Sequence, residues 1–228
     1  MVKNKVISLG GSLIVPDEID VPFLKKFKKI LEKRKDSFYI VCGGGKTARK
    51  YIKAASNFTK DTDHVGIKST WVNAELVKTL FPKAHKEVLI KPKKIKERIA
   101  IHGGNKPNRS SDYEAVELGV FLKDSEVINL TNVDYVYDKN PKKYKNAKHF
   151  EKISWTDYKK ICGNKWIPGL SLPFDPIASR YAQKNNIKVV ILNGKNLKNF
   201  ENYLNGKKFK GTIIEWRLPL SLKIKSGF

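Results

Sequence analysis

The chain has 228 residues, of which 40% are hydrophobic and 11% aromatic. This length suits one α/β domain, and this composition supplies a full core, which excludes disordered and fibrous proteins. No apolar run approaches the roughly 18 residues that a membrane-spanning helix needs, and no signal-peptide pattern opens the sequence. Two distant cysteines and four scattered histidines predict no protein-held metal. The sequence therefore predicts a cytoplasmic protein with no membrane association.

The charge is strongly basic, with 46 Lys plus Arg against 22 Asp plus Glu and a formal net charge of +24. Such a field attracts polyanions, so nucleic-acid binding has to be considered. The lysines are spread over every segment, however, and no nucleic-acid-binding motif is present. Nucleic-acid binding is not expected as the main role, whereas the charge would help an anionic small substrate to arrive.

Short β-branched runs alternate with helical patterns along the chain. Strands are predicted over Val6–Leu9, Phe38–Val41, Val88–Ile90, Ile99–Ile101, Val127–Leu130, Val189–Leu192 and Thr212–Ile214. Helices are predicted over Val21–Lys33 with Asp20 as N-cap, from Lys46, from about Thr70 to Leu80, from a capping box that starts at Ser111, after Ser154 and from Pro176. This alternation, with nearly unbroken apolar strands, predicts a three-layer α/β sandwich with a mostly parallel central sheet.

These elements predict a single domain over residues 1–216, with an N-terminal part to about residue 125 and a C-terminal part over about 126–216. The segment 135–172 is the least regular, and we interpret it as a flap or a connection between lobes. Residues 217–228 follow the last predicted strand. Alternating apolar residues favour an edge strand there, and a frayed tail is an equal alternative.

Three glycine turns follow predicted strands: Gly10-Gly11-Ser12, Gly43-Gly44-Gly45 and Gly103-Gly104. Glycine lets the backbone approach a phosphate, and ligands of open α/β sheets bind beyond the carboxyl ends of the strands. One such turn often needs glycine for shape alone, but three at one end of a sheet predict a phosphate site. A P-loop would need glycine at Ile40, and the dinucleotide fingerprint would need it at Ala48, so neither of these sites fits.

The motifs continue in a recognisable order. After the first two turns and Ala48-Arg49-Lys50 come Gly103-Gly104, Ser110-Ser111-Asp112, Thr131-Asn132-Val133-Asp134, Val136-Tyr137, Pro141 and Asp175-Pro176. This series, from Val6 to about Glu215, resembles the amino-acid-kinase superfamily. The short length, Ala48-Arg49-Lys50-Tyr51, and Gly66-Ile67 before Asn73-Ala74 resemble its archaeal-type uridylate (UMP) kinase subgroup.

The resemblance implies the amino-acid-kinase fold and transfer of the ATP γ-phosphate to UMP, giving ADP and UDP in pyrimidine nucleotide biosynthesis. It also implies Mg²⁺ carried by ATP and a homohexamer. The N-terminal part would be the UMP side, with UMP bound by Gly44, Asp63, Asn105, Lys106, Pro107, Asn108, Arg109, Ser110 and Ser111. The C-terminal part would be the ATP side, and ATP would be bound by Gly11, Ser12, Gly45, Arg49, Thr131, Asn132, Tyr137 and Asn140.

Catalysis would rest on Lys46 and Arg49, which neutralise charge, and on Asp175, which orients a basic group. Arginine suits this task because its guanidinium stays charged and grips oxygens in a bidentate way. The UMP phosphate is already anionic, so the reaction needs positioning and neutralisation more than a general base. Asp63 would take the ribose hydroxyls and so favour ribonucleotides. Taken alone, Asp63 is more typical of an exposed loop acid or an N-cap, and Asp175 before a proline is also typical of an N-cap.

Some positions depart from the family pattern. Ser8 stands where the wider superfamily has lysine, and Trp71 stands where relatives often have arginine. An alternative is therefore another small-molecule kinase of the superfamily, acting on isopentenyl phosphate or a carboxylate. Isopentenyl phosphate would call for an apolar pocket and a histidine, for which His64 is the candidate. A non-catalytic nucleotide- or polyanion-binding protein is a further alternative, against which the retained glycine turns argue.

Overall fold

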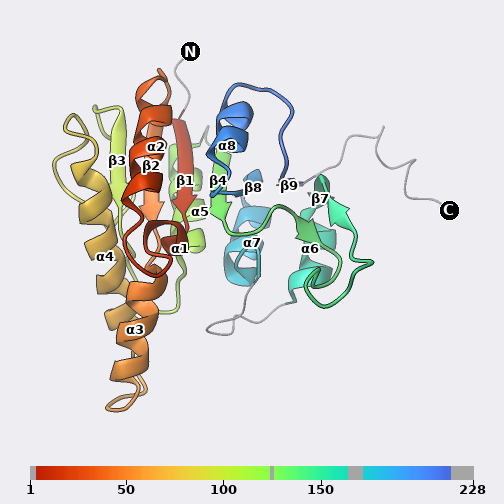
Figure 1. Cartoon of the computed structure of the whole chain (residues 1–228), viewed down its shortest axis with the longest axis horizontal. Helices are drawn as coiled ribbons and strands as arrows, with labels where there is room; N and C mark the ends of the chain where they lie inside the picture. Colours follow the sequence, from red (N-terminus) through yellow and green to blue (C-terminus); the bar gives the residue numbers. More distant parts are fainter. Residues whose placement is uncertain (1–3, 124–125, 164–171, 217–228) are drawn as a thin grey trace.

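A seven-stranded sheet forms the centre of the computed structural model, which describes residues 4–123, 126–163 and 172–216 (Figure 1). Its strand order is β3-β2-β1-β4-β8-β9-β7. Within the described residues, β8 and β9 are the antiparallel pair of this sheet and its other pairs are parallel. The strands are β1 (Asn4–Leu9), β2 (Ser37–Cys42), β3 (Ile99–His102), β4 (Glu126–Thr131), β5 (Val136–Tyr137), β6 (His149–Phe150), β7 (Lys152–Ser154), β8 (Val189–Asn193) and β9 (Thr212–Glu215).

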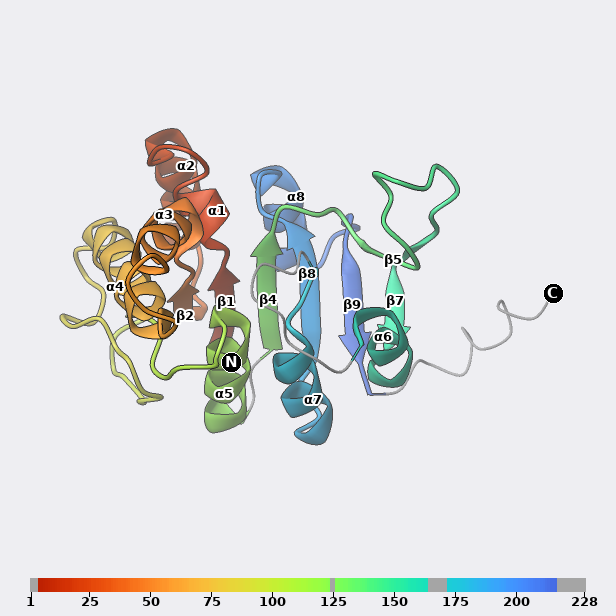
Figure 2. The ribbon, with the colours of Figure 1, turned by 90° about the horizontal axis from the view of Figure 1, so that it is seen from below.

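Helices cover both faces of this sheet (Figure 2). They are α1 (Gly11–Ile14), α2 (Val21–Glu32), α3 (Gly45–Ala55), α4 (Asp63–Thr79), α5 (Ser111–Leu122), α6 (Trp155–Cys162), α7 (Pro176–Lys184) and α8 (Leu197–Leu204). Side chains of α1, α2, α4 and α8 share one buried cluster with Ile7 and Leu9, whereas α5, α6 and α7 share the other with Val6. This alternation places a core on each side of the sheet. The predicted three-layer sandwich with a mostly parallel sheet is confirmed.

Several helix starts follow from their N-caps. The Asp20 carboxylate accepts from the backbone N–H of Phe23 at 2.9 Å, and Ser154 accepts from that of Asp157 at 3.1 Å, as predicted. The cap of α5 is one residue earlier than predicted. Ser110, not Ser111, accepts from the backbone N–H of Tyr113, because Ser110 has the extended conformation of a cap.

Helix α4 is longer than its prediction. It begins at Asp63, whereas the sequence pattern placed the start near Thr70. Gly66 lowers the intrinsic helix propensity of the missed turns. In the folded chain this glycine lets α3 approach closely, because a Cβ at Gly66 would lie only 3.2 Å from Ile52 Cδ1. Tertiary packing therefore overrides local propensity at this point.

One further prediction is wrong, and one is incomplete. Val88–Ile90 is not a strand; Leu89 alone bridges His102, since the edge strand β3 is short and Pro92 follows soon after. The segment 135–172 is not merely irregular, because it contains the β5–β6 hairpin, helix α6 and strand β7, which joins the edge of the main sheet. These strands are too short to show an alternating pattern. The predicted edge strand or tail at 217–228 lies outside the described residues.

The strand order reverses between β1 and β4, and the turns after these strands lie at one edge of the sheet. The backbone N–H of Gly10 donates to Leu130 O of β4, and that of Gly43 donates to Leu9 O of β1, both at 3.0 Å. In open α/β sheets, such a switch point forms the crevice for a ligand. The fold thus brings together the two glycine turns and the end of β4.

Candidate functional site

The first two glycine turns interlock through their backbones. A Cβ at Gly11 would overlap the backbone nitrogen of Gly45, and a Cβ at Gly43 would lie 2.6 Å from the backbone nitrogen of Gly11. Gly45 also has a φ of +61°, which side chains rarely adopt. Glycine is therefore required for packing here, and it lets the backbones at the starts of α1 and α3 approach each other closely.

Next to these turns lies a cavity of about 370 Å³ between α3, α4 and the loop that precedes α5. We call it the acceptor pocket. It is lined by Gly44, Gly45, Ala48, Arg49, Ile52, Asp63, Gly66, Ile67, Thr70, Gly104 and the loop Lys106–Ser111. Every residue predicted for UMP lines it except Asn105. Helix α3, helix α4 and the loop before α5 are far apart in the sequence, and they meet around one cavity. The residues predicted to bind UMP come from these three segments.

The two basic residues at the start of α3 differ in their surroundings. Arg49 is exposed and lines the acceptor pocket, and no acidic residue of the described chain pairs with it. The ammonium of Lys46 forms an ion pair with Asp17, in the segment between α1 and α2. Arg49 therefore faces the pocket with its charge available, whereas the charge of Lys46 is engaged beside it.

Asp63 ties the first turn of α4 to the loop that lines the pocket. Its Oδ2 accepts from the backbone N–H of Asn108 at 2.6 Å. Asn108 has a φ of +59°, a left-handed conformation that asparagine tolerates better than most residues. The carboxylate of Asp63, for which a contact with ribose hydroxyls is predicted, thus connects α4 to the loop on the wall of the pocket.

Helix α4 holds the third glycine turn through two residues that the sequence did not identify as partners. Thr70 Oγ1 accepts from the N–H of Gly104 at 2.7 Å, and Trp71 Nε1 donates to the carbonyl of Gly104 at 2.7 Å. The ammonium of Lys68 lies 3.3 Å from the centre of the Trp71 ring. A Cβ at Gly103 would lie 2.5 Å from Trp71 Cδ1. Trp71, visible in the sequence only as a departure from the family, therefore fixes the turn beneath the pocket.

Glu114 lies beneath the same loop. Burial and the neighbouring Glu117 raise the pKa of its carboxyl to about 7, although the backbone N–H groups of Asn105 and Lys106 favour the charged form. The backbone N–H of Asn105 thus faces Glu114, and Asn105 does not line the pocket. No functional signal for Glu114 is visible in the sequence, since a glutamate in the first turn of a helix is accounted for by capping.

Ser8, Asp112 and Asp175 meet at the end of β1. Ser8 Oγ donates to Asp112 Oδ1 at 2.9 Å, and the backbone N–H of Asp175 donates to Asp112 Oδ2 at 3.3 Å. Burial, reinforced by the charge of Asp175, raises the pKa of Asp112 to about 7 despite the hydrogen bond from Ser8. Ser8, which stands where the wider superfamily has lysine, is therefore hydrogen-bonded to the carboxyl group of Asp112. The sequence pattern indicates Asp112 only as part of a helix cap.

Asp175 itself is the N-cap of α7. Its carboxylate accepts from the backbone N–H of Ala178 at 2.7 Å. Burial raises its pKa, and the Ser110 side chain and the charge of Arg180 act in the opposite direction. Asp175 thus links the end of the acceptor loop to α7, and the orienting role predicted for it stays a prediction.

The residues predicted for ATP lie along the carboxyl edge of the sheet. Gly11 and Ser12 begin α1, Thr131 ends β4 and Asn132 follows it. Tyr137 lies in the β5–β6 hairpin, with its ring centre 6.3 Å from that of His149 and in edge contact. The Asn140 side chain accepts from the backbone N–H of Lys142. The fold gathers the first four near the switch point and leaves the last two on the hairpin.

Two other observations bear on the alternatives. His64 lines a separate cavity on the outer side of α3 and α4, with Tyr51 and Val72, and does not line the acceptor pocket. In the described part of the chain, no helix is long and apolar enough to cross a membrane.

The fold and the pocket agree with the similarity to known proteins. The sequence model of the Amino acid kinase family matches residues 3–193. The uridylate kinase of Thermococcus sibiricus is 35% identical over 222 residues, which cover 92% of this chain and 98% of that protein. The uridylate kinase of Thermoplasma volcanium is 34% identical over 228 residues, which cover 94% and 99%.

Solved structures give the same result. The crystal structure of the uridylate kinase from Archaeoglobus fulgidus matches with a TM-score of 0.80 and 30% identity, covering 93% of this chain and 100% of that chain. The UMP kinase from Ureaplasma parvum matches with a TM-score of 0.77 at 22% identity, which supports the fold alone. The sequence motifs, the sheet with its switch point and these similarities lead to one conclusion: the chain belongs to the amino acid kinase family.

Proposed function

We propose that the chain is a UMP kinase, a transferase that moves the γ-phosphate of ATP to UMP and yields ADP and UDP. The observation that carries the proposal is the acceptor pocket, where Arg49, Asp63 and the loop 106–111 converge beside the interlocked glycine turns. Uridylate kinases that are more than 30% identical over nearly the whole chain support the same acceptor.

The chemistry follows from this arrangement. An oxygen of the UMP phosphate attacks the γ-phosphorus as the bond to the ADP oxygen breaks, so the main task is to align two anions and offset their charge. Arg49 supplies a charge that stays positive, and the turns at Gly11 and Gly45 let backbone approach the phosphates. Asp63 would accept from the ribose hydroxyls with the oxygen that Asn108 leaves free. Lys46 would add its charge once the phosphates of the donor displace the Asp17 carboxylate from its ammonium group.

Magnesium would arrive with ATP. Mg²⁺ is usually bound through substrate phosphates, one or two carboxylates and water, so a site of this kind needs no protein cage. Its chemical contribution would be to neutralise the phosphate oxygens of the donor. Among the described residues that line the acceptor pocket, Asp63 is the one carboxylate, and it is hydrogen-bonded to the loop. This lining fits an ion that is held mainly by the phosphates of the donor.

We also propose that the protein is a cytoplasmic homo-oligomer, a hexamer by resemblance. The support is the cavity of about 520 Å³ on the outer side of α3 and α4, lined by Thr47, Tyr51, His64, Val65, Lys68, Ser69 and Val72. Tyr51 and Val72 are 63% and 65% exposed. Large exposed apolar side chains in a groove are typical of an interaction surface, and we assign this one to another copy of the chain. Light scattering during gel filtration measures the assembly, and a monomer would contradict it.

A coupled ADP-release assay with Mg-ATP and a panel of acceptors tests the reaction: UMP, dUMP, CMP, AMP, isopentenyl phosphate and glutamate. We expect turnover with UMP and much less with dUMP, and Asp63→Asn should reduce this difference. Turnover with isopentenyl phosphate or glutamate in place of UMP would move the protein to another acceptor class. Folded protein that binds RNA and turns over no acceptor would support the non-catalytic alternative.

A further inference from the structure

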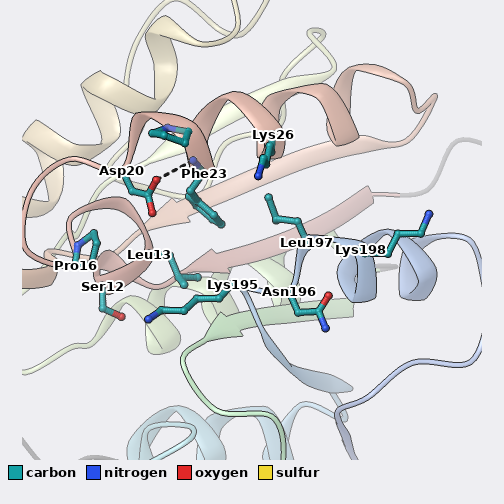
Figure 3. Close-up of a pocket in the computed structure, with 11 residues that line it drawn as sticks. Ser12, Leu13, Pro16, Asp20, Phe23, Lys26, Lys195, Asn196, Leu197 and Lys198 are labelled. Carbon is teal, nitrogen blue, oxygen red and sulfur yellow. Dashed lines mark hydrogen bonds between the residues drawn. The ribbon is translucent and has the colours of Figure 1, made fainter.

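A second cavity, of about 660 Å³, lies between α1, the start of α2 and the start of α8 (Figure 3). We call it the α1–α8 cavity. Its walls combine apolar side chains with polar and basic ones: Ser12, Leu13, Pro16, Asp20, Pro22, Phe23, Lys26, Lys195, Asn196, Leu197 and Lys198. Its volume is in the range of small-molecule sites. Ser12 also belongs to the glycine turn proposed for ATP, so the cavity opens beside the donor.

Lys195 is fixed next to that turn by the backbone before it. The N–H of Gly194 donates to Thr131 O, at the end of β4, at 2.8 Å. A Cβ at Gly194 would overlap Leu13 Cδ1, so α1 packs directly on this glycine. Lys195 therefore follows β8 at the carboxyl edge of the sheet, between two segments proposed for ATP. In Figure 3 its side chain extends toward Ser12.

The charge of Lys195 is available for a ligand. No acidic residue in the described part of the chain forms an ion pair with it. The other groups nearby are engaged: the Asp20 carboxylate caps α2, and Lys198 pairs with Glu201 at 3.0 Å. Lys198 also points away from Ser12 in Figure 3, whereas Lys26 lies on the opposite wall by Leu197. Among the described residues of the cavity, Lys195 is thus the cation that faces the Ser12 end.

The donor side needs such a cation. Ser8 occupies the position of the usual family lysine, and its hydroxyl is bonded to Asp112. Lys46 is paired with Asp17 until the donor displaces that carboxylate, and Arg49 lines the acceptor pocket. The triphosphate of ATP carries several negative charges, which phosphate-binding sites offset with Lys, Arg and backbone N–H groups.

We propose that Lys195 binds the polyphosphate of the donor nucleotide at the Ser12 end of the α1–α8 cavity. The inference rests on the proposed function for the identity of the donor. The ligand class is a nucleoside triphosphate, and the ammonium contacts its phosphate oxygens without forming or breaking a bond. Lys195 and Ser12 reach the same phosphates from β8 and from α1.

The alternative is that Lys195 is one more solvated lysine of a basic chain. Lys195→Gln and Lys195→Ala remove its charge, Lys195→Arg keeps it, and Lys198→Gln and Lys26→Gln are controls from the same cavity. Two quantities are measured: the Kd of Mg-ATP by calorimetry without acceptor, and the KM values for ATP and UMP. Thermal unfolding confirms that each variant is folded.

We expect Lys195→Gln and Lys195→Ala to raise the Kd and KM for ATP roughly ten- to a hundredfold, the range of one charge-assisted hydrogen bond. The KM for UMP should change less than about twofold, Lys195→Arg should retain most of the affinity, and both controls should resemble the unchanged protein. Equal ATP affinity in Lys195→Gln and Lys198→Gln would overturn the proposal, as would a loss confined to Lys26→Gln. Because the Kd is measured without UMP, the result stands even where the panel assay shows another acceptor.

Discussion

Replacement of Asp112 by asparagine should change how the stability of the protein depends on pH. The carboxyl of Asp112 has its pKa raised from the ordinary 3.8 to about 7 by burial, so the unfolded chain ionises it long before the folded chain does. Stability from this group is therefore full below about pH 4 and is lost as the pH rises toward 7. Asparagine has a similar shape and does not titrate, so Asp112→Asn should remove this loss of stability.

The magnitude follows from the size of the shift. A shift from 3.8 to about 7 corresponds to about 4 kcal/mol at about 1.36 kcal/mol per pKa unit. Asp112 is only half-buried as a residue, so we halve this figure to about 2 kcal/mol for solvent screening. The unfolding free energy of Asp112→Asn, relative to that of the unchanged protein, should therefore rise by about 2 kcal/mol between pH 4 and pH 8.

Urea unfolding followed by tryptophan fluorescence at pH 4, 6 and 8 measures this difference. Titrating groups remote from Asp112, such as His102, are present in both proteins and cancel. Any hydrogen bond lost with asparagine adds an offset that does not vary with pH. Ser8→Ala is the companion variant: loss of its hydrogen bond should raise the pKa of Asp112 further and steepen the loss of stability. A difference that stays constant within about 0.5 kcal/mol across the range would refute the assignment of a buried, late-ionising carboxyl.

Three further outcomes are expected. Gly11→Ala should destabilise the protein by about 2 kcal/mol or more, measured by urea unfolding, because its Cβ would overlap the backbone of Gly45; a loss under about 0.5 kcal/mol would contradict the interlocked turns. Burial lowers the pKa of His102 from 6.5 to about 4, so this group should cost up to about 3 kcal/mol of stability as the pH falls from 6.5 to 4, and His102→Gln should lack that loss. Trp71→Phe removes the hydrogen bond to Gly104 and should raise the KM for UMP severalfold with a smaller change in kcat, whereas Lys68→Ala should change both little. Equal kinetic effects of these two variants would exclude a specific role for the indole N–H.

Much of the fold could be predicted because its signals are local. The buried runs of β1, β2, β4 and β8 are nearly all apolar, and Asp20 and Ser154 mark helix starts through their own side chains. The early turns of α4 could not be predicted in the same way. They depend on the contact of Gly66 with Ile52 on another helix, which no local pattern encodes.

The candidate site shows the same division. Its loops could be identified because three glycine turns and a polar loop, each placed after a strand, indicate a phosphate site through their own residues. Thr70 and Trp71 reach Gly104 across more than thirty residues of sequence, and such a contact leaves no trace in a single chain. Asp112 and Glu114 were hidden for another reason: acidic residues at the start of α5 are already accounted for by the helix dipole. Their perturbed pKa values arise from burial, which only the tertiary structure defines.

Helices α3 and α4 form a shared wall, with the acceptor pocket on one side and the groove of Tyr51 and Val72 on the other. The two helices approach each other closely at Gly66, where a Cβ would lie 3.2 Å from Ile52 Cδ1. A neighbour that pressed on the groove and tilted one helix against the other would change the width of the pocket. By thermodynamic reciprocity, a nucleotide that drew the helices together would change the affinity for that neighbour by the same factor. Were a second copy of the chain to cover the groove, assembly and substrate affinity would be linked through this one pair of helices, with no need for a longer route across the sheet.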